Sequence, residues 1–265
     1  MSSFFISAKL GLEFTGIYAI ANYIATMVEI PYRSLSAIVQ PRVAVALRAT
    51  PPDISTATRL FQQVSLNMLL VGSIILILIW INIDLFFDIL PNGQQYATGK
   101  WVVLILALSK LINTSFGIGA SSLGYTRWYY TSLFFTLFLL MLTIVLNNFL
   151  IPICGIEGGA WATLLSTIIY LPLLLLYIKW RVGTYPVSKG QLKVLTLGLL
   201  MFGANYLMVF VVGKLIAEPS LIFRIAEAVV RTGIVAIAGL LMVYYGNVSP
   251  DVTELIQKGI RMLKK

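Results

Sequence analysis

Long apolar runs, separated by short polar turns, fill most of this chain. Many of them reach the roughly 18–20 residues that a helix needs to cross a bilayer. Of the 265 residues, 59% are hydrophobic and only 11% are charged, whereas a soluble domain carries about 25% charged residues. Only helices and closed barrels satisfy their backbone hydrogen bonds in lipid, and the runs lack the short alternating pattern of barrel strands. The sequence therefore predicts an all-α membrane protein.

The breaks between the runs predict a polytopic bundle of seven transmembrane helices, preceded by the end of an eighth. The spans are expected at residues 15–48, 64–87, 100–123, 127–150, 156–177, 194–216 and 221–245. Gly158, Ala162 and Ser166 recur every four residues in the fifth span, which predicts a close-packing helix surface. The predicted organisation is a helix remnant and external loop (1–14), a bundle of five spans (15–180), an extra helix pair (181–246) and a cytoplasmic basic amphipathic tail (247–265).

Basic residues indicate the orientation. Most lysines and arginines near the span ends, including Arg42, Arg48 and Arg127, fall on one side of the membrane. The positive-inside rule makes that side cytoplasmic. Between the first two spans, Asp53 is suited to cap a helix. We expect residues 54–64 to form an amphipathic interfacial helix before the chain re-enters the membrane.

The first span carries charges in its middle. Glu29 precedes Arg33 by four residues, the favourable order for an ion pair on a helix, and Pro31 between them kinks the helix. Charges at mid-bilayer cost roughly 2.5–3.5 kcal/mol each, so they usually line a cavity or pair within a bundle. A pair that only fixes packing is the alternative to a cavity-facing site. At steps of three or four, one helix face holds Tyr18, Asn22, Thr26, Glu29, Arg33, Ser36 and Gln40.

Two other spans carry buried charge. Lys110 lies near the middle of the third span, where Asn113 continues its face. Without an acidic neighbour in sequence, it must meet Glu29, an anionic substrate or water. Thr136 and Thr143 share a face of the fourth span, a weaker signal because hydroxyls bond their own helix backbone. In the seventh span one face holds Arg224, Glu227 and Arg231, a pattern that favours self-pairing over a site.

The composition argues against several classes of protein. There is no histidine and one cysteine, Cys154, so we expect no metal site, no cofactor and no internal disulfide. We predict that the protein is not an enzyme, since no nucleophile lies beside a base and no Gly-rich phosphate loop occurs. The net charge of +9 lies mostly at the ends of apolar runs, which indicates membrane lipids and not nucleic acid as the partner.

Three phrases resemble the C-terminal half of polysaccharide-export flippases of the MATE-like MOP superfamily. They are LGLEFTGIYAIANYI, VEIPYRSLSAIVQPRVA and NNFLIPICGIEGGAWATLLST, in order over roughly residues 10–166. Cys154 departs from the family, in which an aromatic residue is more usual. The resemblance implies two lobes around a central cavity, with this chain as the C-terminal lobe. The chain is then expected to be a fragment that lacks its N-terminal lobe and does not transport alone.

The resemblance also implies a function, the export of lipid-linked oligosaccharide or O-antigen polysaccharide precursors. The substrate would be a glycan on undecaprenyl pyrophosphate, moved across the bacterial cytoplasmic membrane by alternating access. A pyrophosphate needs cationic partners in a low-dielectric cavity, and Arg33 and Lys110 are placed to supply them. Glu29 would tune Arg33 or bind a coupling cation, and the other expected cavity-lining residues are Asn22, Thr26, Gln40 and Asn113.

Three other functions remain open from the sequence. A multidrug exporter of the same superfamily would favour an acidic cavity, whereas the intramembrane residues here are more basic. A membrane-embedded enzyme of glycan assembly would need a long external loop or a histidine-bearing site. A remnant without a function of its own is the third alternative.

Overall fold

Every regular element in the described part of the chain is helical, which confirms the predicted all-α class. The computed structural model describes residues 2–124, 128–188, 190–196, 198, 202–203 and 227–235. The predicted sixth and seventh spans lie mostly outside these residues, and the basic tail lies wholly outside them. The elements are α1 (Ser2–Leu10), α2 (Leu12–Thr26), the 3-10 turn η1 (Met27–Glu29), α3 (Ile30–Arg48), α4 (Ile54–Ile89), α5 (Gly93–Ala97), α6 (Lys100–Phe116), α7 (Ile118–Leu123) and α8 (Tyr129–Arg181).

Two of these helices, α4 and α8, are long and apolar enough to cross a membrane. With 36 residues, α4 is about 54 Å long at 1.5 Å per residue, well over the roughly 30 Å of a hydrocarbon core. Both helices overlap predicted spans: α4 contains the second, and α8 contains the fifth and nearly all of the fourth. Length and composition thus suit this part of the chain to a membrane.

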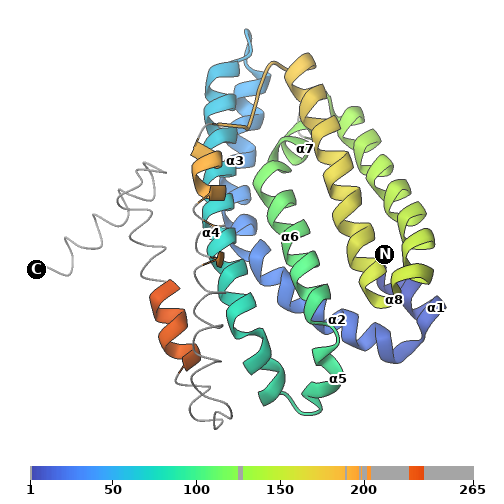
Figure 1. Ribbon diagram of the computed structural model, residues 1–265. Coiled ribbons are helices and arrows are strands. Elements are labelled where there is room, and N and C mark those ends of the chain that lie inside the picture. Colours follow the sequence, from blue (N-terminus) through green and yellow to red (C-terminus); the bar gives the residue numbers. More distant parts are fainter. Residues whose placement is uncertain are drawn as a thin grey trace, which may run out of the picture.

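The helix α8 is a hairpin of two arms, residues 129–154 and 156–181. Gly155 has φ 57° and ψ −135°, a backbone conformation that glycine adopts without the steric cost of a Cβ atom. The arms return alongside each other, because the Thr131 hydroxyl lies 3.1 Å from the Tyr177 hydroxyl (Figure 1). The chain break predicted around Gly155 is therefore confirmed.

The predicted first span is divided at η1. Pro31 has no N–H to donate to the carbonyl of Met27, and the Ile30 N–H donates to that carbonyl from three residues away. A 3-10 turn winds about 120° per residue where an α-helix winds about 100°, so three residues rotate the following helix by about 60°. The predicted kink thus takes the form of a change in helical phase between α2 and α3.

The connection into α4 needs a correction. Asp53 caps this helix as predicted, because its carboxylate accepts a hydrogen bond from the Thr56 N–H at 3.0 Å. Residues 54–64, however, do not form a separate interfacial helix and belong to the continuous helix α4. No glycine or proline occurs between Ile54 and Gly72, so nothing in the local sequence interrupts the helix.

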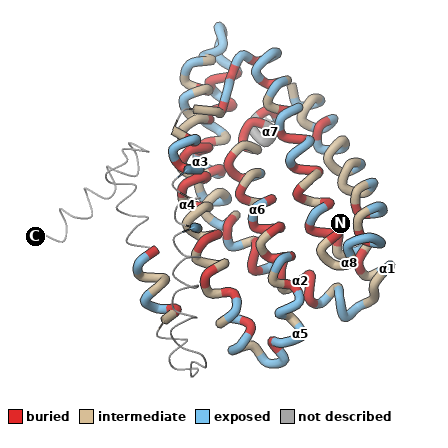
Figure 2. Tube along the Cα trace, viewed as in Figure 1, coloured by how far each residue is buried: buried red, intermediate tan, exposed pale blue. Residues whose placement is uncertain are grey.

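The core lies where α6 packs between α4 and α8 (Figure 1). Figure 2 shows buried residues on the faces of these helices that meet, and exposed residues mainly on their outer faces. The predicted close-packing surface is confirmed, because Gly158, Ala162 and Ser166 are all buried. At neighbouring Gly159, an added Cβ would lie only 2.9 Å from Ile6 of α1. This close approach brings the first residues of the chain against α8, beside the candidate site.

The segment after α8 is fastened to α4 by a buried glutamine. The Gln191 amide donates to the Ser65 hydroxyl at 2.6 Å and to the Pro186 carbonyl at 2.8 Å. Further along, the Asn82 amide of α4 donates to the Thr232 hydroxyl at 2.9 Å. These contacts tie the described parts of the chain after α8 to the outer side of α4, away from the cavity.

Candidate functional site

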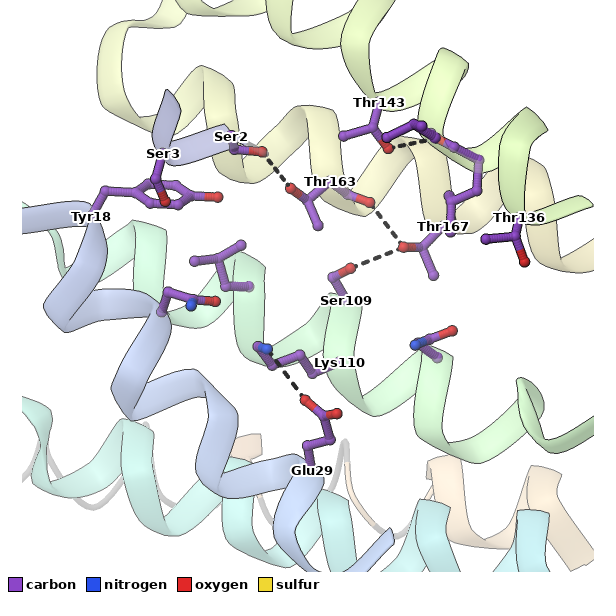
Figure 3. A pocket seen from close by; sticks show the side chains of 15 residues that line it. Ser2, Ser3, Tyr18, Glu29, Ser109, Lys110, Thr136, Thr143, Thr163 and Thr167 are labelled. Atoms are coloured by element: carbon purple, nitrogen blue, oxygen red, sulfur yellow. Dashed lines mark hydrogen bonds and ion pairs between the residues drawn. The ribbon is translucent and has the colours of Figure 1, made fainter. Parts of the chain in front are cut away.

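A polar cavity of about 450 Å³ lies between the N-terminal helices, α6 and α8 (Figure 3). Its volume falls within the roughly 300–1,000 Å³ typical of ligand sites. The lining combines one ion pair with many hydroxyl groups and three leucines. The lining residues are Ser2, Ser3, Tyr18, Asn22, Glu29, Leu106, Ser109, Lys110, Asn113, Thr136, Leu139, Leu140, Thr143, Thr163 and Thr167.

Glu29 lies between two cations. Its Oε2 is 3.4 Å from the Lys110 Nζ, and its Oε1 is 3.7 Å from the Arg33 Nε. The first contact joins η1 to α6 across 81 residues of sequence, whereas the second joins residues one turn apart. One carboxylate therefore neutralises half of the charge of two basic side chains, and the three groups together carry a net charge of +1.

Four of the seven predicted site residues line this cavity, namely Asn22, Glu29, Lys110 and Asn113. The other three predicted site residues are described by the structure but are not in the cavity wall, namely Arg33, Thr26 and Gln40. Arg33 reaches the site only through Glu29, and 65% of its side chain is exposed.

The other two residues have different surroundings. The Thr26 hydroxyl donates to the carbonyl of Asn22 at 2.7 Å. Gln40 lines a second hollow of about 400 Å³ beside Arg48 on α3. Gln40 follows η1, so the change of helical phase there separates it from the cavity wall, whereas Thr26 precedes η1 and is not affected by it.

Sequence reasoning missed five of the twelve polar residues in the wall, namely Ser2, Ser3, Ser109, Thr163 and Thr167. Ser2 and Ser109 are bonded to hydroxyls of the second arm of α8: the Ser2 Oγ lies 3.2 Å from the Thr163 Oγ1, and the Ser109 Oγ lies 3.1 Å from the Thr167 Oγ1. The available signal was the four-residue spacing of the two threonines, with Ser109 next to Lys110. Hydroxyls are common in membrane helices, so this spacing alone does not identify a site.

Other ion pairs lie away from the cavity. Lys100 of α6 is 2.7 Å from Asp84 of α4, and its ammonium lies 5.0 Å from the centre of the Trp80 ring. Arg231 is 3.2 Å from Glu227, which confirms the predicted self-pairing for these two residues. The third member of that cluster, Arg224, lies outside the described residues.

The donor set of the cavity suits organic and anionic groups better than a metal ion. In the described part of the chain, no group of three or more histidine, cysteine or acidic residues could hold a metal. Comparisons with family models, curated proteins and solved structures gave no match. The residues of the cavity and the helices that hold them are therefore what indicates a function for this chain.

Proposed function

We propose that this chain forms one lobe of a flippase that exports lipid-linked oligosaccharide or polysaccharide precursors across the bacterial cytoplasmic membrane. The observation that carries the proposal is the pair of Lys110 and Glu29, 3.4 Å apart in a polar cavity of an otherwise apolar helical bundle. Ionisable side chains inside membrane segments are costly and usually mark a substrate or ion path. The seven-span, MATE-like topology predicted from the sequence belongs to the same proposal.

The charges favour an anionic substrate. Lys110, Glu29 and Arg33 sum to a charge of +1, and a multidrug exporter for cationic drugs would need the opposite sign. A diphosphate would compete with the Glu29 carboxylate for the Lys110 ammonium, through charge-assisted hydrogen bonds about twice as strong as neutral ones. Arg33, on the other side of Glu29, would remain the partner of that carboxylate while Lys110 holds the diphosphate.

The exposed surface beside the site is where the partner lobe would bind. The Arg33 side chain is largely exposed, and the neighbouring hollow on α3 exposes Val45 beside Gln40. In an alternating-access transporter the cavity lies between two lobes. Arg33 would then face the joint cavity in the assembled transporter, where it would add a second cation for the diphosphate.

The test is glycan export by cells whose transporter carries Lys110→Gln or Arg33→Gln. Each change removes a cation and keeps a polar side chain of similar length, and we expect at least a tenfold loss of surface glycan, equal to about 1.4 kcal/mol of lost substrate stabilisation. The matched control is Lys100→Gln, on the same helix α6 but paired with Asp84 outside the cavity, and it should export normally. Normal export by Lys110→Gln, at equal protein levels, would overturn the proposal.

A further inference from the structure

Each threonine that lines the cavity already uses its only hydroxyl proton in a hydrogen bond. Each donates its hydroxyl proton to a carbonyl one turn earlier in α8, and each O···O distance lies between 2.7 and 2.9 Å. A hydroxyl group has one proton and two lone pairs, so these four oxygens face the cavity as acceptors. The pairs are Thr136 with Ser132, Thr143 with Leu139, Thr163 with Gly159, and Thr167 with Thr163.

Because the threonine protons are used in this way, the direction of two hydrogen bonds between side chains is also fixed. Ser2 contacts Thr163, and Ser109 contacts Thr167. Neither threonine has a proton left to give, so both serines must be the donors. Thr163 and Thr167 therefore each accept one hydrogen bond from a serine, whereas Thr136 and Thr143 line the cavity from the first arm of α8 (Figure 3).

The opposite wall has the complementary character. Lys110 of α6 supplies an ammonium with three N–H donors, and Asn22 and Asn113 supply amide groups. The cavity thus has a charged side formed by α2, η1 and α6, and an acceptor side formed by α8. The first side therefore suits an anion that competes with Glu29 for Lys110, whereas the lone pairs on the second side would repel one.

We infer that the α8 wall is a subsite for sugar hydroxyls, with the diphosphate of the same ligand held toward Lys110. Sugar hydroxyls are donors, and they can satisfy acceptor oxygens that a phosphate cannot. This inference rests on the proposed function, since it assigns the two ends of a glycosyl diphosphate to the two walls. It adds an orientation, with the first sugars against α8 and the diphosphate against α6.

The test compares two probes on the purified full chain in lipid nanodiscs, inorganic pyrophosphate and a soluble glycosyl diphosphate. The variant Thr136→Val with Thr143→Val keeps the side-chain shape and removes both acceptors. We expect it to bind the glycosyl diphosphate about tenfold more weakly, the effect of one or two hydrogen bonds, and to bind pyrophosphate unchanged. Serine at both positions should restore binding, and Lys110→Gln should weaken both probes.

The control is Thr15→Val on α2, because that hydroxyl makes the same backbone bond, to Gly11 at 2.9 Å, outside the cavity wall. Unchanged glycosyl diphosphate binding in the double valine variant, or an equal loss for both probes, overturns the sugar subsite. If the unmodified chain binds neither probe, the proposed function itself fails. The two failures are thereby distinguishable.

Discussion

The helix α4 and the first arm of α8 are both strongly apolar, yet they are buried to very different extents. In the most apolar 18-residue window, 56% of α4 is buried, against 11% of α8. Along residues 129–154, only Phe135, Asn147 and Ile151 are buried. Apolarity makes a helix compatible with lipid but does not drive it onto another helix there, because lipid tails are as apolar as leucine. Burial depends on close packing, and the second arm has Gly158, Gly159 and Ala162 for it, whereas the first arm has no glycine or alanine.

The largest expected effect separates two phenylalanines. Phe61 of α4 is 1% exposed and Phe134 of the first arm is 64% exposed. We expect Phe61→Ala to lower the free energy of unfolding by about 3–5 kcal/mol, because it leaves a cavity in a packed core. Phe134→Ala should change it by less than about 0.5 kcal/mol. Unfolding in mixed micelles, followed by helix content, measures both.

The same two variants can also contradict the difference in burial between α4 and the first arm of α8. An equal loss of stability for Phe134→Ala would mean that the first arm is packed against protein and not lipid. That result, obtained only when the proposed partner lobe is co-expressed, would locate the surface on which such a lobe binds.

The second prediction concerns the hairpin that joins the two arms. Gly155 and Gly16 both have open space where a Cβ atom would be added, but only Gly155 has a positive φ, of 57°. Gly155→Ala should therefore destabilise the protein by about 1–3 kcal/mol through backbone strain alone. Gly16→Ala, within α2, should stabilise it by about 0.5–1 kcal/mol through helix propensity. If both variants change the free energy of unfolding in the same direction, the turn at Gly155 does not hold the arms together.

The sequence was sufficient for the features that depend on local pattern. The bounds of the predicted fourth and fifth spans placed the break in α8 between residues 150 and 156, and Asp53 marked the start of α4. On the predicted polar face, Tyr18, Asn22 and Glu29 line the cavity but Thr26 does not. Beyond Glu29, the 3-10 turn before Pro31 changed the helical phase by an amount that periodicity does not reveal. These successes and the failure beyond Glu29 share a cause, because local pattern fixes where a helix starts and stops but not its rotation after a kink.

The sequence places Thr136 and Thr143 on one face of the fourth span, but the rest of the acceptor wall lay beyond prediction for a different reason. It requires Ser2 to meet Thr163 across 161 residues and Ser109 to meet Thr167 across 58. No periodicity within one helix encodes such pairings. Only the packing of α1 and α6 on α8 brings these hydroxyls into one cavity, so the structure was needed to find them.

The smallest expected effect concerns how the two helices begin. The carboxylate of Asp53 caps α4, whereas α8 begins without a side-chain cap at Trp128. The backbone N–H of Thr56 is the main cause that lowers the pKa of the Asp53 carboxyl from 3.8 to about 2, and the Thr56 and Ser55 side chains add to it. Because the pKa is lower in the folded state, the cap stabilises α4 fully above about pH 4.

The contribution of the Asp53 cap to the free energy of unfolding should therefore disappear as the pH falls from about 4 to 2. This range includes first the pKa of Asp53 in the unfolded chain and then its pKa in the folded protein. The matched variant is Asp53→Asn, which retains a good capping side chain and cannot titrate in this range. Thermal unfolding between pH 5 and pH 2 measures this effect. The parent protein should lose more stability than this variant over that range, and the difference should be small because the Asp53 carboxyl is exposed. Parallel pH profiles for the two proteins would show that the start of α4 is as independent of its cap as the start of α8.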